Sequence, residues 1–90
     1  MYVVRLRSMD SGFTLRVFTS KRLALSNFED GQEQVIDEGL EESALFDVAS
    51  TDDPKTAVQL VRQGGASLVR IYPPPMTEAQ AAAWLADLGF

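Results

Sequence analysis

The sequence predicts one small domain of the α+β or α/β class, a two-layer fold with a mixed four-stranded sheet packed with helices. Its 90 residues are enough for one modest core, and 46% of them are hydrophobic and 23% charged, as in ordinary globular proteins. Apolar residues alternate with polar ones in the early segments and recur at helical spacing in the later ones. The predicted order is ββαβαβα, an N-terminal β-hairpin followed by αβαβα, in a single globular domain over residues 1–90.

The hairpin is predicted from period-2 alternation on either side of a turn. In the first segment, one face of the predicted strand carries the apolar residues Tyr2, Val4 and Leu6. The other face carries Val3, Arg5 and Arg7. The second segment repeats the alternation with Phe13, Leu15 and Val17. A turn centred near Asp10 and Ser11 pairs Val4 with Val17, Leu6 with Leu15 and Arg5 with Arg16. We therefore expect the apolar faces to coincide and Arg5, Arg7 and Arg16 to share the outer face.

Helices and strands alternate along the rest of the chain. A first helix is predicted from about Lys21 to Asp30, with a weaker helical continuation towards Gly39, because an interior glycine costs only about 1 kcal/mol. A strand is expected at residues 44–49 and a second strand at residues 67–72. Between them we expect a helix that begins at Pro54 and is capped by Asp53. Strand, helix and strand in so few residues predict a right-handed crossover and a parallel pair.

A final amphipathic helix is predicted after the three prolines at residues 73–75. The expected sheet-covering side chains are Phe28, Leu60, Val61, Trp84 and Leu85. The apolar end of the chain, from Trp84 to Phe90, suggests self-association and a homo-oligomer.

The net charge of -5 conceals a division along the chain. Ten acidic residues and no Lys or Arg lie between Glu29 and Asp53, whereas the remainder holds eight basic residues against Asp10, Glu78 and Asp87, which gives -10 and +5. Such asymmetry is typical of a solvated acidic surface or of a face meant for a charged partner. Whether the two halves pair within one chain or between proteins stays open.

The charge division leads to the main functional hypothesis, a non-enzymatic interaction or regulatory module that binds another protein. The candidate partner-binding residues are Arg5, Arg7, Arg16, Glu41 and Glu42. The alternative is a small-ligand or nucleotide-handling domain with Ser50, Thr51 and Asp52 beyond the carboxyl ends of parallel strands, where ligands of open α/β sheets bind. Asp52 and Asp53 could hold Mg²⁺ there, but Asp53 has a simpler role as a helix cap.

Other function classes find less support in the residues. The chain has no His or Cys, and its Asp, Glu, Lys, Tyr, Ser and Thr form no recognisable catalytic, metal or cofactor motif, which argues against an enzyme. Nucleic acid is disfavoured by the acidic net charge and because Phe18 is the only aromatic residue expected on the arginine face. The absence of cysteine, of a signal-like leader and of a long apolar run favours a cytoplasmic protein that lies outside the membrane.

Overall fold

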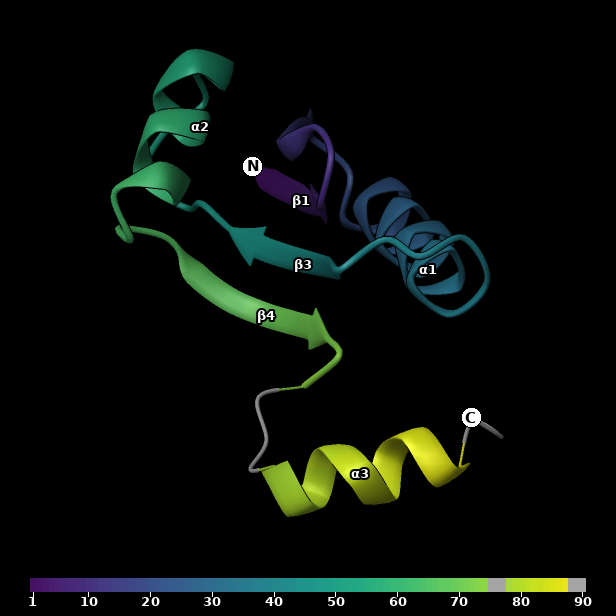
Figure 1. Ribbon diagram of the computed structural model, residues 1–90. Helices are drawn as coiled ribbons and strands as arrows, with labels where there is room; N and C mark the ends of the chain where they lie inside the picture. Colours follow the sequence, from purple (N-terminus) through teal and green to yellow (C-terminus); the bar gives the residue numbers. More distant parts are fainter. Residues whose placement is uncertain (75–77, 88–90) are drawn as a thin grey trace.

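The computed structural model describes residues 1–74 and 78–87, which form four strands and three helices (Figure 1). In chain order these are β1 (Tyr2–Ser8), β2 (Gly12–Phe18), α1 (Lys21–Asp37), β3 (Glu42–Asp47), α2 (Pro54–Arg62), β4 (Ser67–Tyr72) and α3 (Glu78–Asp87). The strands form one sheet in the order β2-β1-β3-β4, and each neighbouring pair is antiparallel. A small α+β domain with a four-stranded sheet is confirmed, whereas the mixed sheet is wrong.

The predicted parallel crossover between β3 and β4 is wrong. The connection between these strands begins and ends at the same end of the sheet. β3 ends at Asp47 and β4 begins at Ser67, and these two residues are paired in the sheet. Between them, α2 packs against β1 and β2 rather than running back along β3. A connection that starts and finishes at one end of a sheet yields antiparallel neighbours.

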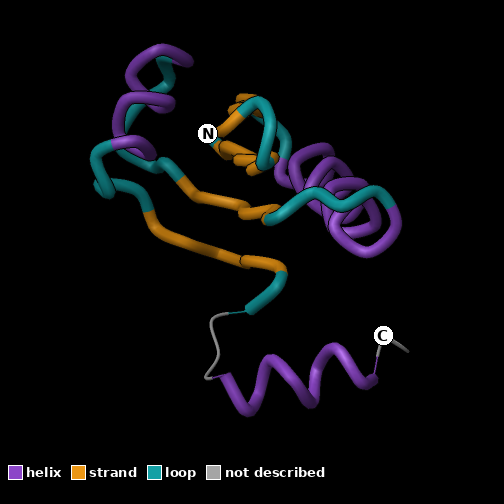
Figure 2. Tube along the Cα trace, viewed as in Figure 1, coloured by secondary structure: helices purple, strands orange, loops and turns teal. Residues whose placement is uncertain are grey.

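The sheet buries side chains on both faces. Val3 and Val4 are consecutive residues of β1 and therefore point to opposite sides, yet both are fully buried. Val3 packs in a cluster with Ala57 and Val61 of α2, and Val4 packs in a second cluster with residues of α1, including Phe28. Figure 2 shows the strands between these two helices. The predicted two-layer arrangement is thus wrong, because each face carries a helix.

Helix α1 extends beyond the favoured end at Asp30 and includes the predicted continuation. Ser20 caps its first turn, where the side-chain hydroxyl accepts a hydrogen bond from the Leu23 amide, and the helix continues through Gly31 to Asp37. Gly31 is buried against the sheet, and a Cβ at this position would lie 2.5 Å from Ser43 Oγ. The glycine therefore allows a close approach of helix and strand. The favoured end at Asp30 is wrong, whereas the helical continuation predicted beyond it is present as far as Asp37.

The hairpin register differs by one residue from the predicted one. Ser8 pairs with Gly12, so the loop has three residues, and Gly12 has a φ of 71°, which is typical of three-residue hairpin loops. Arg5 therefore lies opposite Leu15, and Arg16 lies opposite Val4. A slip of one residue moves every side chain to the other face. The predicted shared face is wrong, since Arg16 lies on the α1 face and Arg5 on the α2 face.

Strands β2 and β4 form the two edges of the sheet. β4 pairs with β3 through a register shift, because Leu45 is opposite Arg70 while Phe46 is opposite Leu68. Figure 1 shows α3 beyond the β4 edge. The predicted packing of the Trp84 and Leu85 side chains and the predicted association through Phe90 lie outside the described part of the structure.

Candidate functional site

Two ion pairs join the arginines of β1 to Glu42, the first residue of β3, and to Glu41, which precedes it. Arg5 Nη2 lies 2.8 Å from Glu42 Oε1, and Arg7 Nε lies 3.2 Å from Glu41 Oε2. A longer contact of 4.0 Å joins Arg7 Nη2 to Glu42 Oε2. The sheet register brings these groups together, because Arg7 is directly opposite Glu42. Four of the five candidate partner-binding residues therefore compensate one another within the chain, and Arg16 lies on the other face.

The Arg5 guanidinium also lies between two aromatic rings. Its Cζ is 5.0 Å from the ring centroid of Phe13 and 5.0 Å from that of Phe46, within the range of cation–π contacts. Arg5 Nε is buried and has no hydrogen-bond partner among the described residues. The sequence reasoning missed both rings and named Phe18 instead, because its register placed Phe13 on the opposite face. A three-residue loop over residues 9–11, with Gly12 as the first residue of the second strand, would have predicted the observed side of Phe13.

Two adjoining hollows lie between edge strand β2 and helix α2, and together they form the β2–α2 groove. The first has a volume of about 170 Å³ and is lined by Arg5, Phe13, Leu15, Val61 and Arg62. The second, wider hollow has a volume of about 340 Å³ and is lined by Val17, Pro54, Lys55, Val58 and Arg62. Arg62 borders both, so the two hollows adjoin each other at its side chain.

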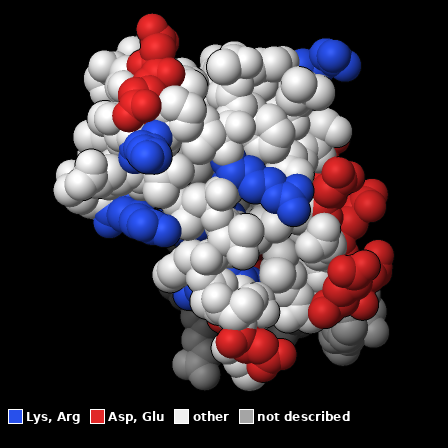
Figure 3. All heavy atoms as spheres, turned by 90° about the horizontal axis from the view of Figure 1, so that it is seen from above, with Lys and Arg blue, Asp and Glu red and all other residues white. Residues whose placement is uncertain are grey.

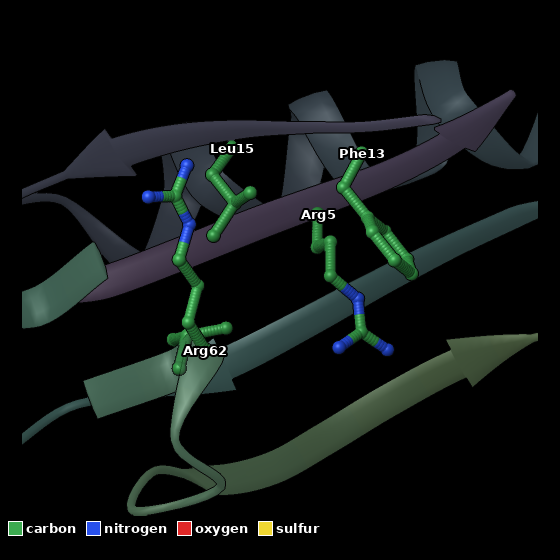
Figure 4. A pocket seen from close by; sticks show the side chains of 5 residues that line it. Arg5, Phe13, Leu15 and Arg62 are labelled. Carbon is green, nitrogen blue, oxygen red and sulfur yellow. The ribbon is translucent and has the colours of Figure 1, made fainter. Parts of the chain in front are cut away.

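The side chains that line the first hollow come from β1, β2 and α2 (Figure 4). Arg62 extends from α2 alongside Leu15 of β2, whereas Arg5 extends from β1 beneath Phe13. The guanidinium groups of Arg5 and Arg62 point in opposite directions, with Leu15 between the two arginine side chains and Phe13 on the other side of Arg5. This arrangement suits an apolar group flanked by polar or charged ones.

The charge of the groove is positive. Its lining includes Arg5, Lys55 and Arg62 but no acidic residue. Glu42 compensates Arg5, whereas Lys55 and Arg62 form no ion pair with any residue in the described part of the chain. Seen from above in Figure 3, several basic side chains lie across the middle of the molecule and others at its upper right border, whereas acidic ones lie mainly towards the border. The groove therefore offers two uncompensated cations beside apolar surface.

The loop before α2 serves as a helix cap. Asp53 Oδ2 accepts hydrogen bonds from the Thr56 amide at 3.0 Å and the Thr56 hydroxyl at 2.7 Å, and these bonds lower the pKa of Asp53, with that from the hydroxyl having the larger effect. The hydroxyl of Thr51 accepts a hydrogen bond from the Asp53 amide at 3.1 Å. Pro54 occupies the first turn, so the predicted cap is confirmed.

A ligand-binding role of Ser50, Thr51 and Asp52 stays a prediction, but its premise is wrong because the strands are antiparallel. Within residues 1–74 and 78–87, no three acidic side chains are grouped so that they could hold a metal ion.

Comparisons with protein-family models, with curated proteins and with solved structures find no match to this chain. None of the helices in the described ranges is both long and apolar enough to cross a bilayer. The β2–α2 groove is therefore the candidate functional site.

Proposed function

We propose that the chain is a non-enzymatic interaction module that binds a partner protein through the β2–α2 groove. The observation that carries this proposal is an apolar depression, bordered by the uncompensated cations Lys55 and Arg62, that runs beside a free sheet edge. Protein interfaces combine apolar centres with a charged rim in this way. Arginine and aromatic side chains such as Arg62 and Phe13 are also enriched among residues that dominate binding energy.

The chemistry of the lining supports binding rather than catalysis. The groove is lined by Phe, Leu, Val, Pro, Lys and Arg side chains, without a carboxylate or hydroxyl to act on a substrate. The Arg5 side chain is held by the ion pair with Glu42 and by the rings of Phe13 and Phe46, so this part of the groove lining has a fixed position. Arg5, Arg7, Glu41 and Glu42 are already paired with one another. We therefore assign the charged contacts with the partner to Lys55 and Arg62.

Affinity capture followed by binding with the purified partner tests this proposal. We expect the double variant Lys55→Ala/Arg62→Ala to weaken the partner's Kd about tenfold or more, because it removes both groove cations. Arg70→Ala is the matched control, since it removes an exposed cation from β4 at the other edge. The Arg70→Ala variant should bind the partner with the same affinity as the unaltered protein. Added salt should weaken the binding of both of these proteins.

Equal affinity of all three proteins for the partner would contradict the proposal. A metabolite that raises the melting temperature, with the shift lost in Asp52→Ala, would instead support the ligand site at Ser50, Thr51 and Asp52.

A further inference from the structure

We infer that the partner contacts this groove with an extended acidic segment, which pairs with β2 as a fifth strand and directs every second side chain into the groove. This inference rests on the proposed function and specifies the chemistry of the partner. It draws on three properties of the β2 side of the molecule: an unpaired backbone edge, a row of apolar residues and an excess of positive charge.

The backbone of β2 is available for pairing. Among residues 1–74 and 78–87, β2 pairs only with β1, so every second residue of β2 directs its amide and carbonyl away from the sheet. Gly12–Phe18 contains no proline, and Arg16 is its only charged residue. The other edge is less regular, because the register shift against β3 leaves Val69 as an extra residue in β4. Irregularities of this kind protect sheet edges from added strands, and the pairing of β2 has none.

The side chains of an added strand would meet the groove in register. Phe13, Leu15 and Val17 lie two residues apart on the α2 face of β2, and all three line the groove. A strand paired with β2 places alternate side chains beside this row, between β2 and α2. The first hollow, of about 170 Å³, is close in volume to cavities that hold a benzene ring. The groove therefore fits valine-sized to phenylalanine-sized residues at alternate positions.

The charge around the edge selects an acidic segment. Lys55 and Arg62 border the groove on the α2 face, and Arg16 is exposed on the α1 face of the same edge. None of the three forms an ion pair within the described residues. Carboxylates on the added strand would supply the missing counter-charges. The net charge of -5 opposes every anionic ligand, but it opposes a nucleic acid more strongly than an acidic segment, because a nucleic acid carries a phosphate at every residue and the segment a carboxylate only at alternate ones.

A synthetic peptide tests the inference directly. The probe is an acetylated nonapeptide in which glutamate alternates with valine and phenylalanine, titrated into ¹⁵N-labelled protein. We expect the largest amide shifts in β2 and α2, together with intermolecular contacts between peptide Hα atoms and β2. The same peptide with glutamine in place of glutamate should bind about fivefold more weakly, and a lysine version should show no saturable binding.

Backbone N-methylation of the peptide separates strand pairing from simple charge attraction. Methylating one set of alternate residues removes the donors that face β2, whereas methylating the other set leaves them in place. We expect binding to be lost with only one of the two sets. Lys55→Gln/Arg62→Gln should weaken peptide binding about tenfold, and Arg70→Gln should leave it unchanged. Amide spectra of the free variants verify that each is folded.

The outcomes distinguish this inference from the proposed function. If neither methylated set affects binding, the added strand is overturned. If a purified partner needs Lys55 and Arg62 but no acidic peptide binds, the partner uses a folded surface, so the inference fails and the proposed function stands. If single-stranded oligonucleotides bind more tightly than the peptide, the acidic segment is overturned. If neither partner nor peptide depends on the groove, both proposals fail.

Discussion

Arg5 links the folding of the sheet to the shape of the groove. Its side chain is 25% exposed and that of Glu42 is 14% exposed, so their 2.8 Å ion pair is largely shielded from water. The ion pair between Arg7 and Glu41 is more exposed to solvent, with side-chain exposures of 44% and 35%. Ion pairs gain strength when they are shielded, and their loss then leaves one charge without a partner. The two pairs should therefore contribute unequally to stability.

Glu42→Gln tests this difference. We expect a loss of about 1–3 kcal/mol in the free energy of unfolding, because the Arg5 guanidinium loses a charged acceptor in a half-buried setting. Glu41→Gln is the matched control and should cost about 0–1 kcal/mol, as exposed pairs do. Urea denaturation measures both. Equal losses in the two variants would contradict the stronger role of the Arg5–Glu42 pair.

Gly31 shows how one residue sets the distance between α1 and the sheet. An added Cβ would lie 2.5 Å from Leu6 Cδ2, 2.5 Å from Ser43 Oγ and 3.0 Å from Ser43 Cβ. The Leu6 methyl can move aside, but Ser43 is fully buried and donates a hydrogen bond to the Phe28 carbonyl at 3.1 Å. Steric conflict should therefore outweigh the helix propensity that alanine gains.

Gly31→Ala should lower the free energy of unfolding by about 1–3 kcal/mol, the usual cost of an overpacked contact. The loss should be smaller when Ser43 is also alanine, because one of the two short contacts is then removed. Urea denaturation of the two single variants and the double variant gives this coupling energy. An increase in stability on Gly31→Ala would show that the helix can shift away from β3 without penalty.

At the scale of elements, α2 depends on its cap. It has nine residues, and helices this short are marginal in water without help from packing and capping. Asp53 accepts two hydrogen bonds from Thr56, and its negative charge lies at the N-terminus of the helix, where the helix dipole favours it. The wall of the groove is therefore held partly by an exposed carboxylate.

The variant Asp53→Asn tests how much the Asp53 carboxylate contributes to stability, because this contribution depends on pH. The folded state lowers the pKa of Asp53, so the carboxylate stabilises the fold above its ordinary pKa. That stabilisation is lost as the pH falls through the lowered value. Asparagine can still cap the helix but does not titrate. We expect the stability difference between the two proteins to be greatest near neutral pH and to vanish in acid, as measured by urea denaturation at each pH.

Asp52→Asn is the matched control for this experiment, because Asp52 is an exposed neighbour outside the cap. A difference of similar size and pH profile for Asp52→Asn would indicate a general charge effect rather than the cap.

Local patterns predicted the elements better than their pairing. The Asp53–Pro54 cap and the strand from Ser67 to Tyr72 follow from short-range chemistry, and both are present as expected. The end of α1 depends on whether Gly31 meets solvent or a strand, which the helical pattern alone does not contain. The hairpin register depends on whether the loop has two or three residues, and sequences rich in Asp, Ser and Gly suit both.

For the whole molecule, the length of the β3–β4 connection was compatible with either strand direction. The outcome depends on α2 packing against Val3 in β1, a contact between distant parts of the chain. The groove was missed for the same reason, since Val61 and Arg62 meet Leu15 only after the sheet has formed. The charge division was visible in the sequence. The structure shows that Arg5 and Arg7 account for two of its ion pairs within the chain.

The shortness of α2 has a consequence for selectivity. One wall of the groove is a nine-residue helix, and the opposite wall is a strand fixed in the sheet. The buried side chains of Ala57 and Val61 attach this short helix to the core. A helix of nine residues is about 13 Å long, so it spans about four residues of an extended segment. The proposed module should therefore recognise a short stretch of its partner and tolerate sequence drift outside that stretch.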